Sequence, residues 1–161
     1  MTARRSARDW EPVEVTNLKS AVARNGFAYW EGLRRGRGFP ARSDVSPRGA
    51  GALLRHIVIV SVVPEPPDYL FRIVGDGVAD AYNLVLSNKR LSEVAVARPE
   101  TGEALKEILA GVCANGQPFA CRNWLKTQTT DETIALREAV FLPLGKRAPV
   151  VDHVLVVDAP V

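Results

Sequence analysis

Two histidines are the residues of this chain best suited to acid–base or metal chemistry. His56 begins an apolar run, and His153 follows directly on Asp152 in a second apolar run near the end of the chain. An imidazole beside a carboxylate, here Asp152 or Asp158, can accept and pass on a proton. Two histidines without a third spaced ligand are a weak metal signal, because zinc sites take three or four protein ligands. The simpler interpretation is that both are residues at strand ends.

Nucleophilic catalysis has no candidate set in the sequence. Cys113 and Cys121 are the two cysteines, too few for a disulfide framework or a thiolate zinc site. Cys121 lies at the start of an expected strand, where a buried and inert thiol is the simpler interpretation. We therefore expect a protein that is not an enzyme. The enzyme alternative is a small isomerase or hydratase that uses His153 with Asp152 or Arg72.

Several polar and aromatic side chains are suited to recognising a ligand. Arg72 could bind an anion through two hydrogen bonds from its guanidinium, or pair with a carboxylate if its face of the strand is covered. Tyr82 could line a pocket, and Trp124 could form a pocket wall or a dimer contact; simple core packing is the alternative for both. The candidate ligand-binding residues are Arg72, Tyr82, Cys113, Trp124 and His153.

Helical spacing predicts the element that leads into the domain. A helix is expected over Thr16–Arg35, with Thr16 as its cap and two glycines after its end. In the Pro-bounded loop that follows, Arg42 and Asp44 are expected to fix the loop by local hydrogen bonds or to contact a partner. The apolar face of the helix, which we expect to form a homodimer contact, contains Leu18, Val22, Tyr29, Trp30 and Leu33.

Apolar, β-branched runs predict a hairpin after this loop. Its strands, His56–Val63 and Tyr69–Val74, are joined by a proline-rich turn. Alternation along the second strand predicts two faces, one with Tyr69, Phe71 and Ile73 and the other with Leu70, Arg72 and Val74.

The second half of the chain predicts one helix and three strands. A stripe of apolar residues at i, i+3, i+4 and i+7 predicts a helix over Pro99–Ala114. Strands are expected over Phe119–Lys126, Thr133–Pro143 and Val150–Asp158. Successive hairpins favour an antiparallel sheet, so the expected class is α+β.

Composition excludes several classes of protein. The chain has 161 residues, 47% of them hydrophobic and 24% charged, which fits one globular domain and excludes wholesale disorder. Its longest apolar run, Ile57 to Val63, is far shorter than the ~20 residues that a membrane-spanning helix needs. No secretory signal is expected, because no apolar stretch follows the arginines near the N-terminus. The default expectation is a cytoplasmic protein with reduced cysteines.

Positive charge is concentrated in the first third of the chain. Residues 1–48 contain ten Lys or Arg and five Asp or Glu, a net charge of +5, whereas residues 49–161 carry −2. Without a zinc-finger or RNA-binding signature, we expect a solvated surface and neither a nucleic-acid nor a membrane partner. We divide the chain into a flexible basic arm over 1–15, a helix and loop over 16–48, and a core domain over 49–161.

The order of these elements resembles that of PAS domains: a helix, two strands, a short helical middle, a longer helix and three strands. Specific motifs add to this resemblance. Tyr29-Trp30, the Pro-x-Arg-x-Asp pattern within Phe39–Pro47, and the Leu53-Leu54 pair resemble the leader of a small bacterial PAS subgroup. The second strand ends in the Arg-x-x-Gly pattern of that subgroup, within Phe71–Gly75.

The resemblance spans about residues 18–157, and the chain departs from it over 76–86, the segment that would cover a ligand pocket. It implies a five-stranded antiparallel sheet with helices on one side and an amphipathic N-terminal helix. It further implies a sensory or signalling domain that binds a small ligand, a signalling protein partner or both. A ligand-free regulatory adaptor is the alternative. The cofactor is unknown: the helix over 99–114 offers no histidine for haem, and neither cysteine lies in a flavin-adduct motif.

Overall fold

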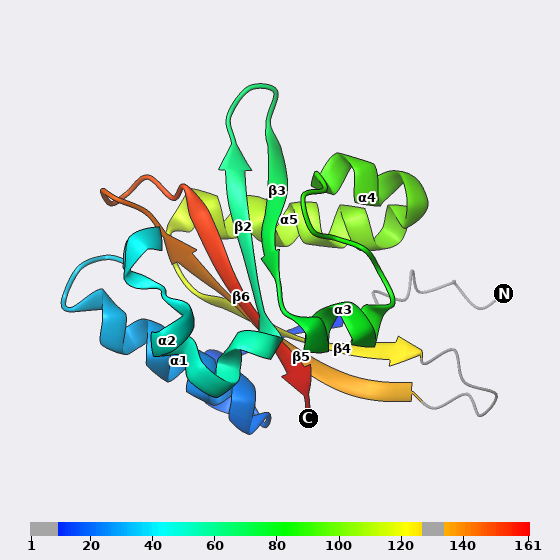
Figure 1. The fold of residues 1–161 in the computed structure, drawn as a ribbon, viewed down its shortest axis with the longest axis horizontal. Helices are drawn as coiled ribbons and strands as arrows, with labels where there is room; N and C mark the ends of the chain where they lie inside the picture. The colour runs from blue at the N-terminus through cyan, green and yellow to red at the C-terminus, as the bar shows by residue number, and fades with distance from the viewer. Residues whose placement is uncertain (1–9, 127–133) are drawn as a thin grey trace, which may run out of the picture.

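The described part of the protein is built on one six-stranded antiparallel sheet (Figure 1). The structure, a computed structural model, describes residues 10–126 and 134–161, and for 124–126, 134 and 135 the backbone only. The strand order in the sheet is β1-β4-β5-β6-β2-β3. The strands are β1 (Trp10–Val13), β2 (Ile57–Val63), β3 (Asp68–Val74), β4 (Phe119–Lys126), β5 (Ile134–Leu144) and β6 (His153–Pro160).

Helices cover both faces of this sheet. The α-helices are α1 (Ala21–Arg34), α2 (Pro47–Ala50), α3 (Asp76–Tyr82), α4 (Leu91–Ala97) and α5 (Pro99–Asn115). Three 3₁₀ helices join them: η1 (Val15–Asn17), η2 (Arg42–Asp44) and η3 (Gly51–His56). The α+β class is confirmed, with six strands in the described residues where five were expected, and with helices on both faces of the sheet where one side was expected.

One face of the sheet is covered by α1, with α2 and η3 beside it. The contact with α1 is close, because a Cβ at Gly26 would lie only 2.7 Å from a methyl carbon of Val157 on β6. Trp30 of α1 is 2% exposed, and its indole nitrogen donates to the carbonyl oxygen of Pro143 on β5 at 2.9 Å. The opposite face is covered by α3, α4 and α5, and Figure 1 shows α5 crossing the strands.

The start of α1 differs from the prediction. The helix begins at Ala21, and its cap is Ser20, whose hydroxyl oxygen accepts from the backbone N–H of Ala23 at 3.2 Å. Thr16 lies in η1 and is exposed. The helical spacing is correct from Val22 onward, but a second Ser/Thr cap candidate lay four residues further along the chain.

Two elements of the structure were missing from the prediction. Trp10–Val13, assigned to the flexible arm, forms β1 and pairs antiparallel with β4 over Ala120–Asn123. Leu91–Ala97, for which no separate helix was predicted, forms α4, in which Leu91 and Val94 are buried. Both segments are short, so their apolar residues do not repeat often enough to predict a helix or a strand.

A bulge in β3 corrects the predicted faces of that strand. Ile59 pairs with Ile73 and Val60 pairs with Phe71, so Arg72 has no opposite residue on β2. An extra residue reverses the alternation beyond it. Ile73 accordingly lies with Ile59 on the face covered by α2, while Phe71 faces the opposite side.

The longer helix and the last three strands agree closely with the prediction. α5 ends one residue later than expected, and Ile108, Leu109 and Val112 from its apolar stripe are buried. The bounds of β4 are as predicted, and β5 and β6 are shifted by one to three residues. Within residues 10–126 and 134–161, no helix has the length and apolar character of a membrane span.

Candidate functional site

A buried polar cluster lies where α3 meets β4, β5 and β6. The hydroxyl of Tyr82 donates to Asp158 Oδ2 at 2.5 Å, and Nδ2 of Asn123 donates to that hydroxyl at 3.1 Å. Nε of Arg137 donates to Asp158 Oδ1 at 2.7 Å, and its guanidinium lies 5.5 Å from the centre of the Tyr82 ring. These four residues, called here the Tyr82 cluster, tie α3 to the sheet.

Burial governs the protonation of this cluster. It raises the pKa of Tyr82, and the charge of Asp158 raises it further, so the phenol stays protonated and donates. Burial also raises the pKa of Asp158, although the guanidinium of Arg137 opposes the shift. It lowers the pKa of neighbouring His56, and the charges of Arg55 and Arg137 add to that effect, so His56 is neutral at pH 7.

Two buried polar atoms beside these hydrogen bonds have no partner among the described residues. They are Nδ1 of His56 and Oδ1 of Asn123. Leaving a buried donor or acceptor unsatisfied costs roughly 1–3 kcal/mol. A water or a small polar molecule that reached these atoms would therefore gain hydrogen bonds that the protein alone leaves unmade.

A second buried carboxylate lies on the other face of the sheet, at the start of α1. Glu138 of β5 is 0% exposed and accepts from the backbone N–H groups of Lys19 at 2.7 Å and Ser20 at 2.5 Å. Its other oxygen accepts from Nη2 of Arg122 at 2.6 Å. Burial alone would raise the pKa of Glu138, but these hydrogen bonds outweigh it and hold the pKa below its ordinary value. This arrangement fixes the helix to the sheet.

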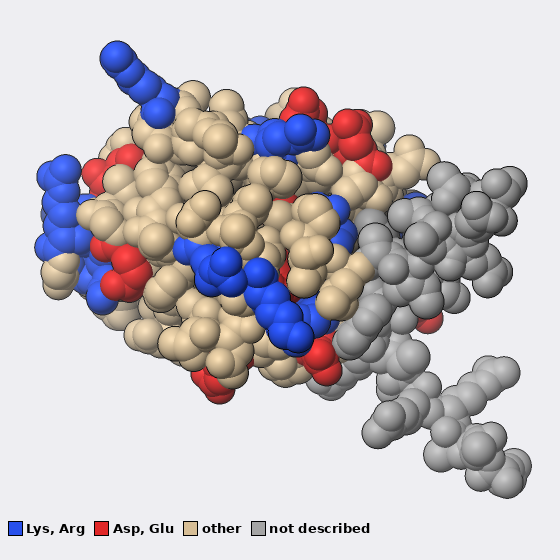
Figure 2. All heavy atoms as spheres, turned by 90° about the horizontal axis from the view of Figure 1, so that it is seen from below, with Lys and Arg blue, Asp and Glu red and all other residues tan. Residues whose placement is uncertain are grey.

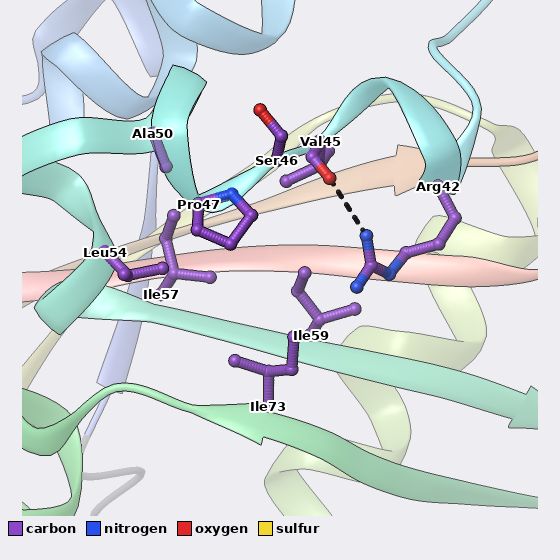
Figure 3. A pocket seen from close by; sticks show the side chains of 9 residues that line it. All are labelled: Arg42, Val45, Ser46, Pro47, Ala50, Leu54, Ile57, Ile59 and Ile73. Carbon is purple, nitrogen blue, oxygen red and sulfur yellow. Dashed lines mark hydrogen bonds between the residues drawn. The ribbon is translucent and has the colours of Figure 1, made fainter.

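An apolar pocket of about 20 Å³ lies between η2, α2 and η3 and the strands β2 and β3 (Figure 3). Arg42 lies at one end of it, and Ala50 and Leu54 lie at the other. The lining residues are Arg42, Val45, Ser46, Pro47, Ala50, Leu54, Ile57, Ile59 and Ile73. Such a volume holds about one water molecule. A small organic ligand does not fit.

Local hydrogen bonds fix the loop that carries the Pro-x-Arg-x-Asp pattern. Oδ2 of Asp44 accepts from the backbone N–H of Ala41 at 2.9 Å and from Nη2 of Arg37 at 2.8 Å. These bonds hold the pKa of Asp44 below its ordinary value. Nη1 of Arg42 donates to the carbonyl oxygen of Val45 at 3.1 Å. The predicted local role of Arg42 and Asp44 is confirmed, and their contact with a partner stays a prediction.

The candidate ligand-binding residues do not come together. Tyr82 is in its cluster, whereas Arg72 is exposed at the bulge of an edge strand, and its role in binding a ligand stays a prediction. Cys113 is half-buried on α5, and burial raises the pKa of its thiol. The side chain of Trp124 lies outside the described part of the structure. His153, at the start of β6, contacts Asp152 through Nδ1 at 2.8 Å.

The two histidines lie at opposite ends of the region in which β2 and β6 pair. β2 and β6 pair antiparallel, with Ile57 opposite Val157 and Ser61 opposite His153. His56 precedes Ile57 and is therefore level with Asp158, far along the strands from His153. No acid–base pair is formed by the two histidines, and no group of three or more His, Cys, Asp or Glu within the described ranges could hold a metal ion.

The expected dimer face of α1 belongs largely to the core of its own chain. Leu18 is 4% exposed and Trp30 is 2% exposed, which corrects their assignment to a partner surface. Val22, Tyr29 and Leu33 are half-buried and pack against the same core. A homodimer through this helix stays a prediction.

Sequence reasoning missed most of the Tyr82 cluster. A signal was present in β5, where Arg137 and Glu138 interrupt an otherwise apolar strand. Adjacent residues of a strand point to opposite faces, so two charged residues in a covered strand require one buried partner on each side. Asp158, in the middle of another apolar run, is one such partner, and Arg122 is the other.

Comparison with known proteins identifies the family of this domain. The family model described as PAS domain matches residues 18–156. That range includes α1, Glu138 with its hydrogen-bond partners, the apolar pocket, and the Tyr82 cluster except for Asp158. The search of curated proteins found no match. Because the family model covers most of its length, the chain belongs to the PAS domain family.

Proposed function

We propose that this PAS domain is a regulatory module with a filled interior, which acts by contact with a partner protein. The observation that carries the proposal is the size of the apolar pocket beside α2, about 20 Å³. A larger hollow of about 510 Å³ beside β1, η1 and the start of β4 is more open and is lined partly by the polar residues Glu14, Asn17 and Arg122. Small-molecule pockets in proteins commonly measure about 300–1,000 Å³. A filled interior favours the adaptor alternative over a ligand-binding sensor.

The interior between the sheet and the helices α3, α4 and α5 supports this proposal. Helix residues there that are at most 7% exposed are Val78, Leu91, Val94, Ile108, Leu109 and Val112. Opposite them, Val60, Phe71 and Phe141 of the sheet are at most 3% exposed. Interiors packed in this way leave few voids larger than a water molecule.

A signal in such a module would be a change in packing rather than ligand uptake. The Tyr82 cluster fixes α3 to β6, and the Glu138 hydrogen bonds fix the start of α1 to β5. Buried hydrogen-bond networks hold the elements that they join in one arrangement, and breaking one of them releases a whole element. A partner that binds one arrangement better than another shifts their populations by its difference in affinity.

A second function, sensing of a small polar molecule, is favoured by one observation. Oδ1 of Asn123 and Nδ1 of His56 are buried beside the Tyr82 cluster without hydrogen-bond partners among the described residues. A ligand with one donor and one acceptor could satisfy them and compete with Tyr82 for Asp158. Such a ligand would have to displace α3 to enter.

Native mass spectrometry of the freshly purified protein, compared with its denatured mass, separates these two functions. The filled-interior proposal predicts the mass of the protein alone, as monomer or oligomer. A reproducible extra mass that is lost on denaturation contradicts it and favours the second function. In that case the extra mass should disappear in Tyr82→Phe and persist in Tyr69→Phe, because the ring of Tyr69 lies outside the cluster.

A further inference from the structure

We propose that the pocket beside α2 docks an acidic segment of a partner protein and takes the tip of one of its apolar side chains. The docking surface, called here the α2 groove, consists of Val45, Pro47, Ala50, Leu54, Ile57, Ile59 and Ile73. This inference rests on the proposed function, because it names the surface and the partner chemistry through which that function would act.

The size of the α2 groove indicates a side chain rather than a free ligand. Its enclosed space of about 20 Å³ takes the tip of one aliphatic group. The isoleucines of β2 and β3 form the floor, and Pro47 and Ala50 form a wall (Figure 3). Leu54, at the open end, is 40% exposed. An apolar anchor in such a depression, surrounded by polar contacts, is how protein interfaces commonly concentrate their binding energy.

The charge around the α2 groove indicates the rest of the partner segment. Arg42 lines the groove at one end, and its bond to Val45 uses only one of its nitrogens. Three further arginines on the bounding elements are exposed: Arg48 on α2, Arg55 on η3 and Arg72 on β3. Figure 2 shows the molecule from below the view of Figure 1, with basic side chains at one end of that face and across its middle and acidic side chains beside them.

Acidic groups on the same elements do not neutralise these arginines. The carboxylate of Asp44 is engaged by Arg37 and by the backbone of Ala41. Asp68, at the far end of β3, accepts from the hydroxyl and backbone N–H of Ser92. The surface therefore favours Asp and Glu side chains on either side of the anchored apolar residue, and electrostatic complementarity would guide their approach.

A peptide selection tests this inference without knowledge of the natural partner. A phage-displayed library of random 12-residue peptides is selected on the immobilised protein, and the enriched sequences are read. We expect enrichment of peptides that combine one Leu, Ile, Met or Phe with several Asp or Glu. The strongest peptide, made synthetically with a fluorophore, is then titrated by anisotropy against wild-type protein and variants.

Charge and apolar contact are separated by matched variants. Arg42→Glu combined with Arg48→Glu is expected to weaken the peptide about tenfold or more, and raised salt should do the same to wild type. Leu54→Ser tests the apolar contact and should weaken it about fivefold. Lys106→Glu, a single charge reversal at an exposed position of α5, should leave affinity unchanged. Circular dichroism confirms that each variant is folded.

Three outcomes overturn the inference: no enriched sequence, enriched peptides without acidic residues, or binding that the groove variants leave unchanged while they stay folded. None of these contradicts the proposed function, because a partner could dock elsewhere. The proposed function fails separately, if native mass spectrometry shows a retained small molecule.

Discussion

At the scale of single residues, two buried carboxylates join helices to opposite faces of the same sheet. Glu138 receives the first N–H groups of the α1 region and the guanidinium of Arg122. Asp158 receives the hydroxyl of Tyr82 and the guanidinium of Arg137. Removing one partner of such a pair leaves an uncompensated buried charge, which commonly costs about 3–5 kcal/mol. These residues therefore decide whether the helices stay in place.

The pH dependence of stability provides a test at Glu138. Its pKa in the folded protein lies below its ordinary value of 4.5, so the carboxylate stabilises the fold above that pH. The contribution is lost as pH falls through the folded-state pKa. We expect Glu138→Gln to lower the free energy of unfolding by about 2 kcal/mol at pH 7, measured by urea denaturation. The difference from wild type should shrink below pH 4.5.

The test compares the free energy of unfolding of wild type with that of Glu138→Gln. Asp44 and Asp68 also have lowered pKa values, so they add to the acid sensitivity of both proteins. A gap between wild type and Glu138→Gln that stayed constant from pH 7 down to strongly acidic conditions would contradict the assigned role.

The sequence indicated that Arg137 and Glu138 needed partners, but only the sheet register identified them. Which residues face each other across strands depends on pairing, and no local pattern encodes it.

At the scale of elements, the start of α1 depends on a single cap. Ser20 caps the helix through its hydroxyl, whereas Thr16, the cap expected from the sequence, lies outside it. Ser20→Ala should cost about 1 kcal/mol, the usual loss on removing an N-cap side chain. Thr16→Ala should change the free energy of unfolding by less than about 0.5 kcal/mol. Equal losses in the two variants, measured by chemical denaturation, would contradict this description of the helix start.

The packing of α4 on α5 provides a second test with a control in the same helix. A Cβ at Gly102 would lie 2.7 Å from Cα of Ala95, whereas nothing lies within 4 Å of a Cβ at Gly111. Gly102→Ala should therefore destabilise the protein by about 2 kcal/mol, because the helices would have to separate. Gly111→Ala should stabilise it by up to about 1 kcal/mol, because alanine favours the helix. Melting temperatures that rise in both variants would mean that α4 does not pack closely.

Elements whose apolar pattern repeats several times could be predicted from the sequence, and short elements could not. The stripe on α5 and the apolar runs of the strands extend over several repeats, so their patterns identified them. β1 has four residues and α4 has seven, and tertiary contacts rather than local preference decide their structure. The bulge at Arg72 follows from pairing with β2, and it moved Ile73 into the α2 groove.

At the scale of the whole molecule, the sheet is covered on both faces, and the proposed output surface brings apolar and basic groups together beside α2. α1 and the helices α3 to α5 shield most of the sheet. The α2 groove remains accessible through Leu54 and is bordered by arginines. The resemblance in the sequence led to the fold and the family. It pointed to Arg42 but did not locate the rest of this surface, because the groove combines Val45 with residues from α2, η3, β2 and β3.

Site-specific photo-crosslinking in cells tests the central claim, action through a protein contact at this groove, most directly. A photoreactive phenylalanine analogue is placed at Leu54 in one variant and at Lys106, on the opposite face, in another. We predict protein adducts at position 54 that fall strongly when Arg42→Glu and Arg48→Glu are added, and none above background at position 106. The absence of adducts at position 54, or equal adducts at both positions, would contradict the claim.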